Sequence, residues 1–173
     1  MIKAIVLISD GSEEIESVTP IDVLRRAGVT VDVASVTGLN IVGSRGIKIQ
    51  ADKLVCDVDF ADYDCVVVPG GMPGARIISE NALAVKGIKE ALFGGKVVGA
   101  ICASPAVVLG ENNLLGGKSA TCFPAPDFIK VLGDRYTGKD VEVDGNLVTA
   151  NGPLSAMEFA LKLCEVLKVQ PKL

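Results

Sequence analysis

The sequence contains no histidine and no tryptophan, and only 4% of its 173 residues are aromatic. Without histidine, the chain cannot form a Cys-His dyad, a Ser-His-Asp triad or a His-ligated metal site from its own residues. A carboxylate is therefore the side chain that remains for proton transfer. Because aromatic residues are scarce, Val, Ile, Leu and Ala must fill the interior, which is typical of sheets covered by helices on both faces.

Three further absences narrow the class of protein. A net charge of −4 and the lack of any clustered Lys/Arg run argue against a nucleic-acid partner. The apolar run near the N-terminus, AIVLI, is far shorter than a membrane span, so we expect a first core strand and no membrane partner. The cysteines lack CxxC spacing, which argues against a zinc site and favours free thiols in a reducing, cytoplasmic compartment. They are Cys56, Cys65, Cys102, Cys122 and Cys164.

Apolar, strand-like segments alternate with helix-like segments along the chain. We expect strands within residues 3–9, 29–36, 64–71, 96–102, 118–123 and 146–151. We expect helices from Ser12, as the N-cap, to Ala27, and near 75–92, 104–115 and 155–168. This alternation predicts an α/β fold with a doubly wound, mostly parallel sheet between helices, and Asp144-Gly145 predicts a small antiparallel hairpin. No linker interrupts the pattern, so we expect one domain over residues 1–173.

Cys102 lies where one of these buried strands ends, directly before Ser104-Pro105. Pro is well tolerated in the first turn of a helix, and the small residues around the cysteine permit a tight, strained turn like a nucleophile elbow. The dipole of the following helix and its free amides predict a thiol that ionises more readily than an ordinary cysteine, whose pKa is about 8.5. The alternative is a small apolar core residue; we favour a functional thiol at this junction.

The segment SDGSEEIESVTP supplies candidate carboxylates beyond the end of the first strand. On a helix, Glu16 shares a stripe with Pro20 and Val23, and this apolar face is expected to point inward. Glu13 and Glu14 fit ordinary charges of a first helical turn. A carboxyl placed inward beside a thiolate would have a raised pKa and could hold a proton. The alternative is a solvated glutamate at the helix start.

Pro69-Gly70-Gly71 follows another buried strand. Glycines at such a turn let successive backbone N–H groups point into the space above the sheet, as an anion pocket requires, although a plain turn is the alternative. The segment lacks a Walker-type Lys-Ser/Thr and a complete GxGxxG pattern, so it does not indicate a nucleotide site. We expect no cofactor and no metal.

Six segments of the chain carry a family resemblance: DGSEEIESVTPIDVLRRAGV, SRGIKIQAD, YDCVVVPGGMPGA, GAICASPAVVL, TCFP and NGPLSAMEFAL. In this order they resemble the ThiJ/PfpI superfamily and, within it, the DJ-one branch, over nearly the whole chain. The resemblance implies a flavodoxin-like α/β fold and a homodimer. It also implies site residues. Cys102 would be the oxidisable nucleophile, Glu16 its hydrogen-bonded proton relay, and the amides of Gly71 and Ala103 the border of an anion pocket.

The resemblance further assigns Arg26 and Arg45 to the pocket mouth or the dimer interface. There they would bind anions, or alternatively form ion pairs between subunits. Two departures from the family pattern concern histidine. Many relatives have it where this chain has Phe123, and protease-like members have it where this chain has Ala103, so a peptidase is not expected.

Two functional classes remain. The first is a cofactor-independent glyoxalase or deglycase that acts on small aldehydes such as methylglyoxal and glyoxal, or on glycated products, and protects against oxidative stress. The second is a peroxide-responsive redox sensor or chaperone, in which Cys102 is oxidised to a sulfinic acid without significant catalysis. Both use Cys102 and Glu16.

Overall fold

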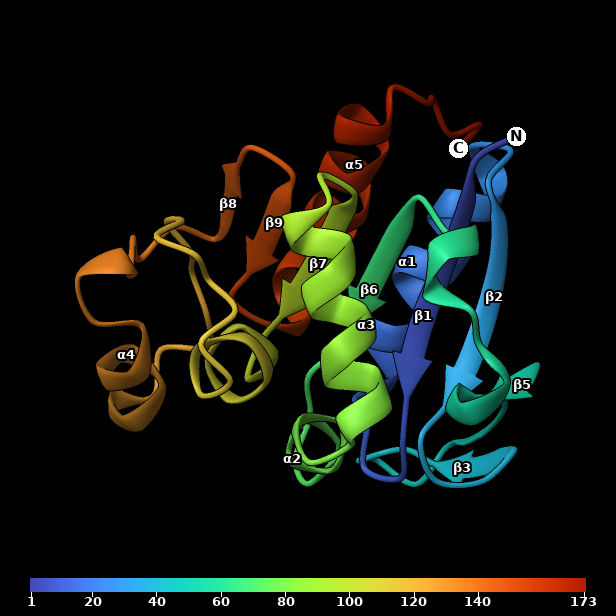
Figure 1. Ribbon diagram of the computed structural model, residues 1–173, viewed down its shortest axis with the longest axis horizontal. Helices are drawn as coiled ribbons and strands as arrows, with labels where there is room; N and C mark the ends of the chain where they lie inside the picture. The colour runs from blue at the N-terminus through green and yellow to red at the C-terminus, as the bar shows by residue number, and fades with distance from the viewer.

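A seven-stranded sheet forms the centre of the computed structural model, which describes residues 1–173 (Figure 1). The strands of the protein are β1 (Lys3–Ile8), β2 (Thr30–Ser35), β3 (Asn40–Val42), β4 (Lys48–Gln50), β5 (Lys53–Leu54), β6 (Cys65–Val68), β7 (Val97–Ile101), β8 (Val141–Asp144) and β9 (Leu147–Ala150). The sheet order is β5-β2-β1-β6-β7-β9-β8, and all neighbours pair in parallel except β8 and β9. A separate antiparallel pair joins β3 to β4.

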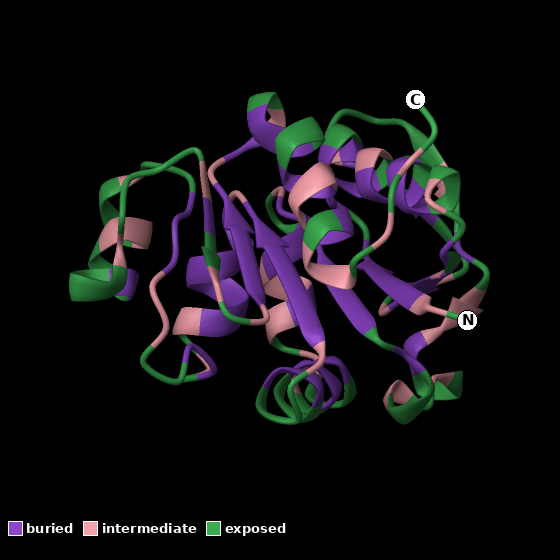
Figure 2. Ribbon diagram, turned by 90° about the horizontal axis from the view of Figure 1, so that it is seen from above, coloured by how far each residue is buried: buried purple, intermediate pink, exposed green.

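Helices cover both faces of this sheet. The helical segments of the chain are α1 (Glu14–Arg26), α2 (Gly74–Ser79), α3 (Ala82–Phe93), α4 (Pro126–Leu132), α5 (Ala156–Leu167), the π-helix η3 (Pro105–Gly110) and the 3-10 turns η1 (Val55–Asp57), η2 (Phe60–Asp62), η4 (Gly133–Arg135) and η5 (Pro153–Ser155). α1 and α5 pack on one face, and α2, α3 and η3 on the other. Figure 2 shows the buried strands between helices whose outward surfaces are exposed. No helix combines the length and apolar character needed to cross a bilayer.

The two helical layers explain why the central strands are apolar without alternation. Successive side chains of a strand point to opposite faces, and here each face meets a core. Ile5 and Leu7 of β1 enter the core on the α3 side, whereas Val6 and Ile8 enter the core on the α1 side. Every residue of β6 and β7 is buried. The sheet is thus a rigid platform for the loops at its carboxyl ends.

The predicted α/β fold, with a mostly parallel sheet and a hairpin after Asp144, is confirmed. Three local predictions differ from the structure. Residues 118–123 form no strand, because Ala120 makes only an isolated bridge to Tyr136. The stretch 75–92 is divided into α2 and α3, and 104–115 contains only the six-residue η3. The helix α4 and the hairpin β3–β4 were not predicted.

The start of α1 also differs by one residue from the prediction. Glu13 is the N-cap, and its carboxylate accepts a hydrogen bond from Glu16 N at 2.8 Å. Ser12 Oγ instead accepts from Ser9 N at 3.0 Å and so closes the loop before the helix. The longer Glu13 side chain reaches the first free amides of the helix.

A substitution of Gly99 tests the packing between β7 and α5. A Cβ at this position would lie 2.8 Å from Phe159 Cζ and 2.9 Å from Leu163 Cδ2, and both of these side chains are fully buried. We predict that Gly99→Ala lowers the free energy of unfolding by about 1–3 kcal/mol, as overpacking of a core does. Gly38→Ala is the matched control, because a Cβ there meets nothing within 4 Å. Urea denaturation of both variants measures the difference, and equal stability would contradict the packing argument.

Candidate active site

Cys102 follows the last residue of β7 in a sharp turn. Its φ of 64° lies in the left-handed region, which is unusual for a residue with a side chain and costs about 1–3 kcal/mol. Three hydrogen bonds hold this turn. Cys102 N donates to Ala150 O at 2.8 Å, Phe123 N donates to Cys102 O at 2.8 Å, and Ser104 Oγ donates to Pro69 O at 2.5 Å. The strained turn predicted from the sequence is present.

Glu16 reaches this thiol from the first turn of α1. The residue is fully buried, and its Oε1 accepts a hydrogen bond from Gly70 N at 3.0 Å. A Cβ on Gly70 would lie 2.6 Å from Cys102 Cβ and 2.7 Å from Glu16 Oε1, so only glycine leaves room here. The structure therefore brings together Glu16 and Cys102, and excludes the solvated position for Glu16.

The Glu16 carboxyl has one oxygen without a partner. Oε2 is buried and makes no hydrogen bond of normal geometry, although the carboxyl lies beside the Cys102 thiol. Burial, together with the nearby charge of Glu13, raises the pKa of Glu16 to about 7. This carboxyl can thus take up and release a proton near neutral pH.

The prediction that Cys102 has an unusually low pKa is wrong for the state in which Glu16 is charged. Burial, and then the Glu16 carboxylate, raise the pKa of Cys102 to about 12, above that of Cys122 at about 11. The helix behind the thiol has only six residues, so its dipole is short. Once Glu16 takes up a proton, the repulsive charge is gone and its O–H can donate to sulfur. The two groups therefore titrate as one unit.

Backbone amides oppose this rise in the pKa of Cys102. The N–H groups of Gly71 and Ala103 both donate toward the sulfur and lower its pKa. Gly71 has φ of 85°, a conformation that favours glycine, and a Cβ there would lie 2.5 Å from Glu13 N. Both predicted amides thus lie at the thiol, where they can stabilise a thiolate or another anion.

The thiol opens into a cavity of about 360 Å³. Its lining is Glu13, Glu16, Ser44, Arg45, Gly71, Met72, Cys102, Ala103, Phe123, Phe128 and Pro153. Arg45 is therefore at the pocket, as one of its two predicted positions requires. Arg26 is not: it lies in the last turn of α1 and pairs with Asp22 at 2.7 Å, so its predicted place at the pocket mouth is wrong. No cluster of three or more His, Cys, Asp or Glu side chains is arranged to hold a metal ion.

Glu14 has a role that the sequence reasoning missed. It is buried, and its carboxylate accepts hydrogen bonds from Arg45 N at 2.9 Å and Ile47 N at 3.0 Å. Although burial raises the pKa of Glu14, these backbone bonds bring it below its usual value. A Cβ on Gly43 would overlap the same carboxylate, which shows how tightly the turn packs on it. Glu14 thereby holds the β3–β4 turn that carries Arg45. The only signal of this role in the sequence is the pair of adjacent glutamates at the helix start.

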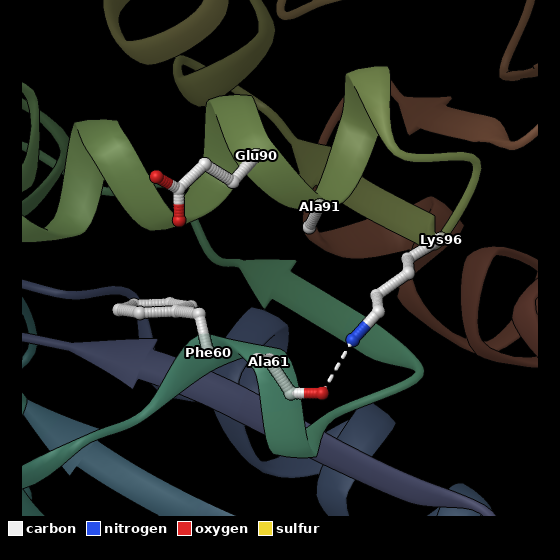
Figure 3. Close-up of a pocket in the computed structure, with 5 residues that line it drawn as sticks. All are labelled: Phe60, Ala61, Glu90, Ala91 and Lys96. Atoms are coloured by element: carbon white, nitrogen blue, oxygen red, sulfur yellow. Dashed lines mark hydrogen bonds between the residues drawn. The ribbon is translucent and has the colours of Figure 1, made fainter.

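A second hollow, shown in Figure 3, lies away from the thiol between η2 and α3. Phe60, Ala61, Glu90, Ala91 and Lys96 line it, and Lys96 Nζ donates to Ala61 O at 2.7 Å. The Phe60 ring packs where a Cβ on Gly87 would stand. These contacts fasten η2 to α3, and the one nucleophilic group in the lining, the Lys96 amine, is held by the Ala61 carbonyl.

Comparison with known proteins identifies the family of the chain. Residues 2–166 match the model of the DJ-1/PfpI family. The chain belongs to this family. The family resemblance noted in the sequence is confirmed.

Three similar proteins illustrate the membership in the DJ-1/PfpI family. Protein DJ-1 homolog B of Arabidopsis thaliana is 43% identical over 93% of this chain, which spans only 37% of that protein's length. The glutathione-independent glyoxalase DJR-1.2 of Caenorhabditis elegans is 32% identical over 95% of this chain and 87% of its own. The solved structure of oxidized Toxoplasma gondii DJ-1 matches with a TM-score of 0.92 and 45% identity, over 96% of this chain and 91% of its own.

Replacement of Glu16 tests its contact with the thiol. Glu16→Gln keeps an acceptor for Gly70 N and gains an amide donor for the sulfur, whereas Glu16→Leu offers neither. A hydrogen bond to a charged group contributes about 1.5–3 kcal/mol, which corresponds to about one to two pKa units. We predict that the pKa of Cys102 is lower by this amount in Glu16→Gln than in Glu16→Leu. Alkylation rates against pH measure it, with the exposed thiol of Cys56 as the internal control. Equal pKa values would contradict the contact.

Proposed function

We propose that the protein is a cofactor-independent glyoxalase or deglycase that acts on methylglyoxal, glyoxal or glycated products through Cys102 and Glu16. The observation that carries the proposal is the buried Glu16 carboxyl beside a thiol that also receives two backbone amides. The similarity to the Caenorhabditis elegans glyoxalase supports the same activity. A peptidase is not proposed, because the chain has no histidine to serve as its base.

The proposed reaction needs no external oxidant. The Cys102 thiolate adds to the aldehyde carbon of methylglyoxal, and the carbonyl electron pair moves to oxygen, which the amides of Gly71 and Ala103 can stabilise. Glu16 then removes the proton from this carbon and delivers a proton to the neighbouring ketone carbon. The first carbon is oxidised to a thioester and the second is reduced to an alcohol. Water hydrolyses the thioester, so one methylglyoxal and one water give one lactate and the free thiol.

In this proposal Glu16 performs both proton transfers alone. The place of the histidine found in many relatives is taken by Phe123, whose ring can neither accept nor donate a proton. A carboxyl with a pKa of about 7 is well matched to this task, because it is half ionised near neutral pH. We therefore expect a modest aldehyde turnover combined with a protective role in oxidative stress.

A redox sensor or chaperone is the second candidate. The similar structure from Toxoplasma gondii is that of an oxidized protein. In this chain Cys102 is partly exposed, so peroxide can reach it. The thiolate would displace water from one peroxide to form a sulfenate, and a second peroxide would oxidise this to a sulfinate. Protonated Glu16 would donate a hydrogen bond to the sulfinate oxygen.

We also propose that the protein is a cytoplasmic homodimer. Large apolar side chains of α1 and the β3–β4 hairpin are exposed, and Glu14 joins these two elements, which supports an interface there. They are Ile15, Val18, Val42 and Ile47. Arg26 is exposed on the same helix, so its place at the dimer interface stays a prediction.

Parallel assays of aldehyde turnover and peroxide oxidation separate the two candidates. We predict that Cys102→Ser abolishes lactate formation from methylglyoxal. Glu16→Gln should reduce kcat by about 10²-fold or more, because an amide cannot relay the proton. The same Glu16→Gln variant should still gain the mass of two oxygen atoms at Cys102 with peroxide.

Glu90→Gln is the control, because this exposed glutamate lies outside the Cys102 cavity. A wild-type protein that oxidises at Cys102 but forms no lactate would overturn the glyoxalase proposal and leave the redox candidate. Full lactate formation by Glu16→Gln would show that another group moves the proton.

A further inference from the structure

The cavity at Cys102 has two chemically different parts. Its thiol end is polar, with the carboxyl of Glu16 and the amides of Gly71 and Ala103. The rest of the lining contains three further polar side chains, Glu13, Ser44 and Arg45, and an apolar border of four side chains, Met72, Phe123, Phe128 and Pro153. A volume of about 360 Å³ is in the range of small-molecule sites and holds far more than the few atoms of methylglyoxal. Most of the apolar border would contact nothing in a complex with so small an aldehyde.

Phe123 is fixed beside the thiol by the backbone. Its N–H donates to Cys102 O at 2.8 Å, and its own carbonyl accepts from Ala125 N at 2.8 Å. Despite this fixed position, the residue is 44% exposed. An aromatic ring held at a cavity wall with this much surface in water gains free energy when an apolar group covers it.

Another hollow, distinct from the one between η2 and α3, continues the apolar border past Phe123. It has about 250 Å³ and shares Phe123 and Pro153 with the thiol cavity. Leu154, which also lines it, is fully exposed. Because the two hollows share Phe123 and Pro153, apolar surface extends from the thiol cavity and ends at Leu154. We call this end, formed by Phe123, Pro153 and Leu154, the apolar subsite.

We propose that the apolar subsite binds an aryl or branched-alkyl group of the substrate, so that the protein favours 2-oxoaldehydes with such a group over methylglyoxal. This inference rests on the proposed glyoxalase function. The aldehyde carbon bonds to Cys102 Sγ and its electron pair moves to oxygen, as for methylglyoxal. The ketone carbon, one bond further, carries the apolar group toward Phe123. Phe123 is then a specificity-determining residue. This role explains why an aromatic side chain, which cannot transfer a proton, stands at this position.

Thiol labelling tests the subsite without any turnover. Cys102 and the exposed Cys56 of one sample are labelled with N-phenylmaleimide and with N-methylmaleimide, and mass spectrometry gives the rate at each thiol. We expect the phenyl-to-methyl rate ratio to be about tenfold higher at Cys102 than at Cys56, which is the usual lower limit of selection by an apolar pocket. Phe123→Ala should bring the two ratios together, whereas Phe123→Leu should retain most of the difference. Equal ratios in the wild type would overturn the proposal.

Turnover measurements with two aldehydes test the proposed substrate preference. The ratio of kcat/KM for phenylglyoxal to that for methylglyoxal should fall about tenfold in Phe123→Ala. It should stay unchanged in Phe93→Ala, which removes an exposed ring outside both hollows. A ratio that Phe123→Ala leaves unchanged would overturn the proposed specificity while the glyoxalase function stands. Selective labelling without turnover of either aldehyde would overturn the glyoxalase function and support the subsite.

Discussion

The close approach of three chain segments at Gly70 is the constraint on which the site depends. Gly70 N holds the Glu16 carboxyl, and the space where a side chain would stand is taken by Cys102 Cβ and Glu16 Oε1. The end of β6, the turn after β7 and the first turn of α1 can meet only because this residue has no Cβ. Ser104 Oγ donates to Pro69 O, so a hydrogen bond also joins the turn after β7 to the loop after β6. The rigid sheet behind them fixes the geometry.

Burial gives this pair of acids its chemistry. Burial in a poorly solvated space raises the pKa of both the carboxyl and the thiol, and the Glu16 carboxylate raises that of Cys102 further. The amides of Gly71 and Ala103 favour a single negative charge near the sulfur. The result is a pair that carries one movable proton at neutral pH without an imidazole. This arrangement explains how a chain with no histidine can support proton transfer at a nucleophile.

The three glutamates at the start of α1 show how neighbouring residues of one type acquire different roles. Glu13 caps the helix, Glu14 holds the turn that carries Arg45, and Glu16 faces the thiol. A helix directs successive side chains about 100° apart, so three segments of the fold are reached from a single turn. The polar end of the cavity is therefore built mainly from this turn, whereas its apolar border comes from later loops.

The sequence by itself determined the alternation of strands and helices and the strained turn at Cys102, because strand burial and small neighbours are local properties. Helical periodicity left Glu16 with an inward and a solvated alternative, and the tertiary structure decided for the inward one. The sequence could not determine the pKa order of the thiols, since burial and the charge of a distant glutamate outweigh a local dipole. The tertiary structure alone placed Arg45 in the cavity and Arg26 outside it, and converted Glu14 from a surface charge into a buried anchor. It also showed that 118–123 is no strand, because α4 and the loops around it lead the chain away from the sheet edge. Each of these outcomes depends on contacts between segments far apart in the chain, which local patterns do not contain.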